Sequence, residues 1–197
     1  ALLAVTGVGV VYFGYLGVTS RPGEGDSLAY HVPIAKIIAQ GRVGDRGEYS
    51  DWLYYYPATG EAMLAVMMKL GLPLNLYNLL GWVVLGAVVV AWGRQMGMGR
   101  YAAIVMGVAV MWWPTVVRLI LTQTVDIWLL VFWLMCVVWL EREGMGWKYW
   151  AGLGVWMGAL VGVKYSGPLY LGILGLFYWR KFWEGRKWWG VVAAAMF

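Results

Sequence analysis

Six stretches of this sequence are long, apolar and almost free of charge, and few folds other than a bundle of membrane helices accommodate them. A helix that crosses a bilayer needs about 20 apolar residues, because a backbone in lipid must satisfy its own hydrogen bonds. A further apolar stretch occupies residues 188–197. The pattern predicts an all-α, polytopic membrane protein with about six to seven spans. The stretches cover residues 2–19, 75–92, 101–121, 125–140, 147–163 and 168–179.

The composition agrees with a membrane protein and disagrees with a soluble domain. Apolar residues make up 62% of the 197 positions, whereas soluble domains are nearer half apolar. The chain begins at Ala1 and stops at Phe197, each inside an apolar run, so we expect an internal piece of a longer protein. On this interpretation residues 1–197 form a single truncated membrane domain that is inactive alone. The single cysteine, Cys136, lies within an apolar stretch and has no partner for an internal disulfide.

Charged residues predict which side of the membrane each connection faces. Lys and Arg cluster in short connections at residues 94–100, 142–148 and 180–187, and basic connections prefer the cytoplasm. These connections share one side only if residues 61–70 do not cross, which agrees with the short length of that stretch. Residues 20–74 then form a large external first loop of a cell-membrane protein. Topology thus explains the net charge of +5, which gives no indication of nucleic-acid binding.

The external loop contains a predicted surface helix with an acidic residue at its start. Apolar residues recur at helical spacing over residues 28–40, with Lys36 on another face, which predicts an amphipathic helix at the membrane surface. Pro33 either opens a second helix or kinks the first. Asp26 precedes this helix, at a position where a carboxylate caps exposed backbone N–H groups. Asp26 therefore has either this structural role or a functional one.

Other ionisable residues lie near the predicted outer ends of the spans, and each has two interpretations. Asp126 occupies the first turn of a span, where it either stabilises the helix dipole or serves a function. Lys164 and Arg118 either extend toward the membrane interface or bind a ligand. His31 alone does not make a zinc site, because the sequence has no second histidine.

Four short segments on the predicted external face combine residues that are typical of one enzyme superfamily. They are Asp26-Ser-Leu-Ala-Tyr-His-Val-Pro33, Tyr56-Pro-Ala-Thr-Gly-Glu61, Thr122-Gln-Thr-Val-Asp126 and Gly158-Ala-Leu-Val-Gly-Val-Lys-Tyr-Ser-Gly167. In residues and in order, they resemble the amino-terminal membrane half of the GT-C superfamily of polytopic glycosyltransferases. The likeness is greatest to bacterial relatives of the protein O-mannosyltransferases and of the lipid A aminoarabinose transferases (glycosyltransferase family 39-like).

The resemblance implies a reaction and roles for individual residues. Asp26 matches the first-loop aspartate that serves as catalytic base, and the donor would be a sugar on a polyprenyl phosphate. The acceptor would be an external lipid, protein or glycan, and the anomeric centre would be inverted. No organic cofactor is implied, and use of a divalent cation is left open, with Glu24, Asp26 and Asp126 as candidate metal ligands. The residues expected to bind substrate or phosphate are Tyr30, His31, Glu61, Arg118, Asp126 and Lys164.

Two other classes of protein remain open at this point. Charges near membrane segments also mark ion and proton routes, so Asp126, Lys164 and Arg118 would suit a transporter or flippase. Against that interpretation, these charges lie near one surface, and the sequence shows no inverted repeat of its spans. The third class is a non-catalytic membrane protein with a GT-C-like fold. Accessibility labelling separates a transporter from an enzyme, because a transporter exposes Asp126 to each side in turn.

Overall fold

The computed structural model describes residues 2–43, 57–142 and 146–184. All regular secondary structure in these residues is helical, which confirms the all-α prediction. The apolar stretch at residues 188–197 and the start of the second motif at Tyr56 lie outside the described residues.

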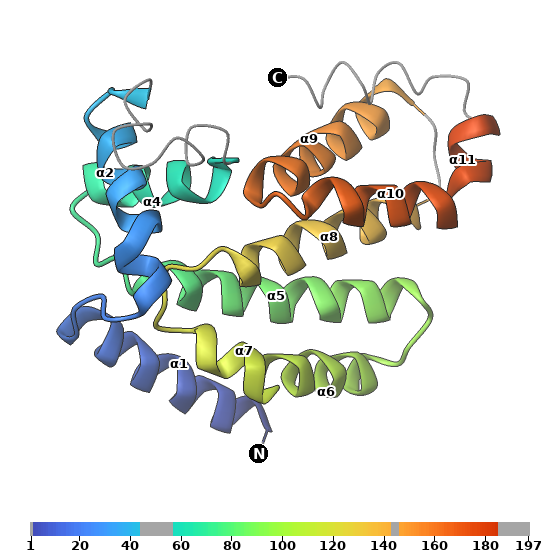
Figure 1. Cartoon of the computed structure of the whole chain (residues 1–197). Coiled ribbons are helices and arrows are strands. Elements are labelled where there is room, and N and C mark those ends of the chain that lie inside the picture. Colours follow the sequence, from blue (N-terminus) through green and yellow to red (C-terminus); the bar gives the residue numbers. More distant parts are fainter. Residues whose placement is uncertain (1, 44–56, 143–145, 185–197) are drawn as a thin grey trace.

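Most of the helices lie alongside one another as a bundle, and the chain runs back and forth along it (Figure 1). They are α1 (Leu2–Thr19), α5 (Leu76–Gln95), α6 (Arg100–Met111), α7 (Pro114–Leu119), α8 (Asp126–Leu140), α9 (Trp147–Val163) and α10 (Gly167–Phe177). α5 packs against both α6 and α8, and α8 packs in turn against α9. α1 lies on the flank of the bundle, against α5 and α6.

The two ends of the bundle carry different segments of the chain (Figure 1). One end carries a single π-helical turn, η1 (Ser27–His31), together with α2 (Val32–Ala39) and α4 (Thr59–Lys69). The turns that precede α8 and follow α9 lie at this same end. The opposite end carries the connection from α5 to α6 and the short α11 (Trp179–Glu184). The described parts of the four motifs therefore gather at one end.

α4 does not extend along the bundle. Its 11 residues give a length of about 16 Å, well short of the roughly 30 Å apolar core of a bilayer. It packs against α2 and α9 at the end of the bundle. α10, which is predicted to cross, also has 11 residues, so the prediction that residues 61–70 do not cross a membrane stays a prediction.

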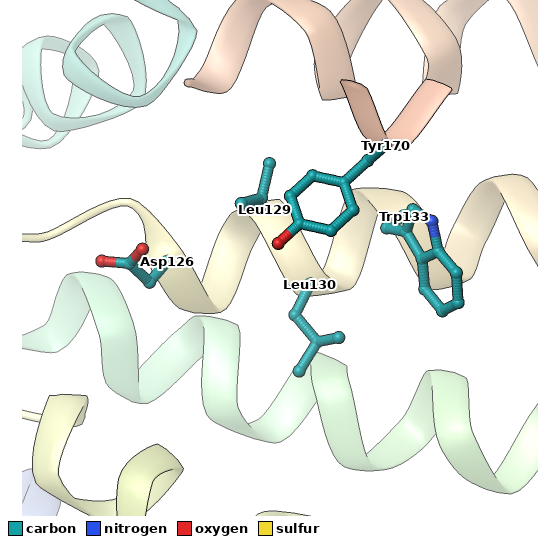
Figure 2. A pocket seen from close by; sticks show the side chains of 5 residues that line it. All are labelled: Asp126, Leu129, Leu130, Trp133 and Tyr170. Atoms are coloured by element: carbon teal, nitrogen blue, oxygen red, sulfur yellow. The ribbon is translucent and has the colours of Figure 1, made fainter. Parts of the chain in front are cut away.

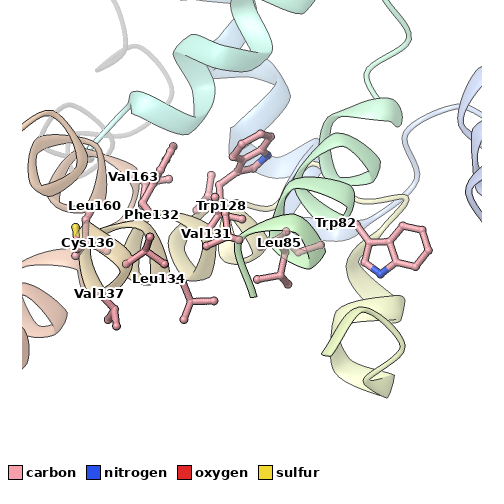
Figure 3. Packing of buried hydrophobic residues seen from close by; sticks show 14 of the residues in the cluster. Trp82, Leu85, Trp128, Val131, Phe132, Leu134, Cys136, Val137, Leu160 and Val163 are labelled. Carbon is pink, nitrogen blue, oxygen red and sulfur yellow. The ribbon is translucent and has the colours of Figure 1, made fainter. Parts of the chain in front are cut away.

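The core forms where α5, α8 and α9 meet. Leu85, Val131 and Leu160 are buried there, each at most 1% exposed, whereas the buried Trp82 lies on the other side of α5 (Figure 3). The indole N–H of Trp82 donates to the carbonyl of Met111 at 2.6 Å, which ties α5 to the end of α6. Apolar side chains are as well accommodated by lipid as by protein, so the hydrophobic effect does not drive membrane helices together. They associate through close packing and hydrogen bonds of this kind instead.

Two of the described helices, α1 and α5, are long and apolar enough to cross a membrane. In α5, 56% of the most apolar 18-residue stretch is buried within the bundle, whereas in α1 the share is 11% and apolar side chains such as Val8 and Val11 are exposed. An exposed apolar helix of this length is suited to lipid. The helices α6, α8 and α10 are apolar but shorter. Membrane association therefore rests on α1 and α5, and a larger number of spans stays a prediction.

The prediction of one continuous span over residues 101–121 is wrong. The segment is divided into α6 and α7 at Trp112 and Trp113. Trp113 has an extended backbone (φ −61°, ψ 130°), which is the conformation that a following proline imposes, and Pro114 opens α7. A single proline near the end of the apolar stretch thus turns one predicted element into two.

The helix predicted over residues 28–40 also consists of two elements. The π-helical turn η1 comes first, and Pro33 then lies in the first turn of α2, so this proline opens a second helix. α2 is amphipathic as predicted, because Ile34 and Ile37 are buried whereas Lys36 is exposed. α2 packs against α4, and its location at a membrane surface stays a prediction.

Candidate functional site

The acidic start of the first motif has a defined geometry in which Glu24, and not Asp26, caps η1. Glu24 Oε1 accepts the backbone N–H of Asp26 at 3.1 Å. Glu24 Oε2 accepts both the backbone N–H and the hydroxyl of Ser27, at 2.7 and 2.8 Å. Asp26 makes no side-chain capping bond and is exposed, so the capping role predicted for it is wrong. Its carboxylate is left facing solvent, where a general base would meet an acceptor.

The hydrogen bonds to Glu24 change its acidity. Partial burial acts to raise the pKa of Glu24, but hydrogen bonds from Ser27 and Asp26, with a smaller effect of His31, outweigh burial and lower the pKa. Glu24 therefore stays ionised to a lower pH than an ordinary glutamate.

His31 and Glu61, both predicted to bind substrate, bind each other. His31 Nδ1 lies 2.6 Å from Glu61 Oε1, and the two side chains are 2% and 0% exposed. The ring of Tyr30 lies against that of His31, with the centroids 4.2 Å apart. Burial removes His31 and Glu61 from direct contact with a ligand. Their pairing instead fastens η1 to the first turn of α4, which joins the first motif to the second.

Asp126 and Lys164 meet at the same end of the bundle. Lys164 Nζ lies 2.6 Å from Asp126 Oδ1 and donates a hydrogen bond to it. Asp126 belongs to the first turn of α8, and Lys164 follows α9 directly with an extended backbone (φ −157°, ψ 149°). The side chains are 41% and 24% exposed, so both remain accessible from outside. The third and fourth motifs are thus joined by an ion pair.

A cavity of about 320 Å³ opens beside Asp126. Its walls come from α8 and α10, and in Figure 2 the hydroxyl of Tyr170 points toward the end at which Asp126 lies. Away from the carboxylate, the lining is apolar and aromatic. The cavity therefore suits a ligand with a polar group at one end and hydrocarbon at the other. Its lining residues are Asp126, Leu129, Leu130, Trp133 and Tyr170.

A buried network of amides and hydroxyls holds the turn before Asp126. Gln123 Nε2 donates to Asn75 Oδ1 at 2.6 Å, and Asn78 Nδ2 donates to the carbonyl of Thr124 at 2.9 Å. The backbone N–H of Gln123 donates to Ser27 Oγ at 2.9 Å. Sequence reasoning missed this network, although polar residues that flank long apolar stretches are a signal for it.

Two further predicted residues stand apart from these contacts. Arg118 lies on an exposed part of α7, and within the described ranges it forms no ion pair with an acidic residue of the site. Tyr30 belongs to η1 and contacts the site through the ring of His31. Arg118 is therefore available to an external anion, whereas Tyr30 supports the buried pair.

Two of the candidate metal ligands have other partners in the structure. Both oxygens of Glu24 accept hydrogen bonds from the start of η1, and Asp126 is paired with Lys164. In residues 2–43, 57–142 and 146–184, no group of three His, Cys, Asp or Glu side chains is arranged to hold a metal ion. No step of a reaction is therefore assigned to a cation.

Comparison with known proteins gave no match. No family model, no curated protein and no solved structure matches this chain at a significant level.

Proposed function

We propose that this chain is part of a membrane glycosyltransferase, which moves a sugar from a polyprenyl-phosphate donor to an external acceptor. The observation that supports the proposal is the gathering of the described parts of four GT-C-like segments at one end of the bundle. Three ionisable residues lie at this end: Asp26 directly before η1, Asp126 at the start of α8, and Lys164 directly after α9. The segments are far apart in the sequence, so local structure alone does not explain why they meet.

In this proposal Asp26 is the catalytic base. Its exposed carboxylate accepts the proton of an acceptor hydroxyl while the hydroxyl oxygen attacks the anomeric carbon. The bond between that carbon and the phosphate oxygen breaks, and the polyprenyl phosphate leaves with the electron pair. Attack from the side opposite the phosphate inverts the anomeric centre, as in inverting glycosidases.

The departing phosphate requires positive charge. Lys164 is the first candidate, because it donates to Asp126, which lines the cavity, and this contact fixes where the ammonium lies. Asp126 thereby orients Lys164, and Arg118 on α7 is the second candidate for the phosphate. The cavity beside Asp126 would hold the first part of the prenyl chain, because its deeper walls are apolar.

The proposal includes a location and a topology for the protein. We assign it to the cell membrane as a multi-pass protein of six to seven spans, with the motif-bearing end external. The support is the separation of motifs and basic connections to opposite ends of the bundle, together with the preference of Lys and Arg for the cytoplasm.

The test is Asp26→Asn in the full-length protein, reconstituted in proteoliposomes with polyprenyl-phosphate sugars. We expect release of polyprenyl phosphate to fall by about 10²–10⁴-fold, the usual contribution of a general base, with donor binding unchanged. Asp26→Glu keeps a carboxylate and is expected to retain part of the turnover. Full activity in Asp26→Asn would falsify the assignment of Asp26 as the base.

A further inference from the structure

The hydroxyl of Ser27 joins the two acidic segments of the site. Ser27 Oγ donates to Glu24 Oε2 at 2.8 Å and accepts the backbone N–H of Gln123 at 2.9 Å. Ser27 follows Asp26 directly, and Gln123 precedes Asp126 by three residues. One oxygen atom therefore connects the loop that carries Asp26 to the turn that carries Asp126.

The Ser27 hydroxyl and its partner Gln123 are buried. Ser27 and Gln123 are both 0% exposed, so water does not replace a hydrogen bond lost between them. Asn75, directly before α5, holds the other side of the Gln123 turn. Its Oδ1 accepts a hydrogen bond from the side-chain Nε2 of Gln123 at 2.6 Å. The turn is thus fixed from two directions. The contact with Ser27 is the direct one to the residue next to Asp26, whereas Asn75 reaches the same segment at Ser20, six residues before Asp26.

We propose that Ser27 is a positioning residue that sets where Asp26 lies relative to Asp126 and Lys164. This inference rests on the proposed function, because it concerns the geometry of that site. A catalytic group must be held close to its productive position, and a displacement of about 1 Å costs on the order of 10²-fold in rate. Ser27 contributes no chemistry of its own, since its buried hydroxyl is occupied in both directions.

The test combines a structural readout with kinetics on the full-length protein in proteoliposomes. Ser27→Ala removes the hydroxyl, and Ser27→Thr retains it. Thr19→Ala is the matched control, because the Thr19 hydroxyl bonds within α1, to the carbonyl of Tyr15 at 2.8 Å. Hydrogen–deuterium exchange of the backbone N–H of Gln123 reports its hydrogen bond to Ser27 without any assumption about function. Release of polyprenyl phosphate gives kcat and KM.

We expect the Gln123 amide of Ser27→Ala to exchange about tenfold faster, because its hydrogen-bond acceptor is gone. We also expect kcat to fall by up to about 10²-fold with KM unchanged. Ser27→Thr should restore both quantities toward the wild-type values, and Thr19→Ala should change neither.

Unchanged exchange at Gln123 in Ser27→Ala would overturn the proposal, as would faster exchange with a wild-type kcat. Faster exchange throughout α5 would indicate general unfolding and would also contradict a local positioning role. A wild-type protein that releases no polyprenyl phosphate contradicts the proposed function, and with it the role of Ser27 in catalysis. The exchange data would still decide separately whether the Ser27 connection exists.

Discussion

His31 and Glu61 form a buried hydrogen-bonded pair whose effect on stability depends on keeping both members. At 2% and 0% exposure, neither side chain has water to replace a lost partner. We expect Glu61→Ala or His31→Ala to lower the free energy of unfolding by about 1–3 kcal/mol, because each leaves a buried polar group without its hydrogen-bond partner. Denaturant unfolding in detergent measures the effect.

The matched variant for this pair replaces both residues by apolar ones, His31→Leu with Glu61→Met. Replacing both members of a buried hydrogen-bonded pair is often close to neutral, so the double variant should be more stable than either single variant. A double variant with a loss equal to the sum of the two single losses would show that the side chains act independently.

Glu24 predicts a pH dependence of stability. Its pKa is lowered in the folded protein, so its contribution is fully present above the unfolded-state pKa of about 4.3 and is lost as the pH falls through the folded value. As the pH falls below 5, the midpoint temperature of thermal unfolding should therefore drop more steeply for the wild-type protein than for Glu24→Gln. Identical pH profiles for the two proteins would contradict the capping role of Glu24.

Among helices, the contact between α4 and α9 depends on the absence of a side chain at Gly162. A Cβ atom added at Gly162 would overlap the hydroxyl of Thr59 at the start of α4. Gly162→Ala should therefore destabilise the protein by about 1–3 kcal/mol, the usual range for overpacking. Thermal unfolding in detergent measures the loss, and adding Thr59→Gly should recover much of it.

Gly172 provides the control for this prediction. It also lies in a helix, α10, but a Cβ atom there would meet nothing within 4 Å. Gly172→Ala should be neutral or stabilising by up to about 1 kcal/mol, because alanine has the higher helix propensity. Equal destabilisation at both glycines would contradict a specific contact at Gly162.

The sequence was sufficient to predict most elements but few of their contacts. Hydropathy alone predicts the bounds of α1 and α9, because each fills a whole apolar stretch. The break between α6 and α7 was missed because hydropathy does not register the effect of Pro114. The cap from Glu24 is local, within three residues, but hydropathy does not distinguish it from a cap by Asp26. The bond between Ser27 and Gln123 depends on tertiary structure, because it joins residues 96 positions apart. No local pattern contains that information.

For the whole molecule, the account depends on one end of the bundle facing a single compartment. Whether α4 crosses is decisive, because a crossing helix at that position would place Asp26 and Asp126 on opposite sides of the membrane. The path of the chain back and forth along the bundle carries the turn before α8 and the turn after α9 to the same end (Figure 1).

Thiol labelling in sealed, right-side-out vesicles tests this arrangement most directly. Asp26→Cys and Asp126→Cys would be introduced separately with Cys136→Ala, and Arg142→Cys would mark the opposite end of the bundle. We predict that a membrane-impermeant reagent labels positions 26 and 126 in intact vesicles, and position 142 only after permeabilisation. Labelling of positions 26 and 126 from opposite compartments would contradict the account.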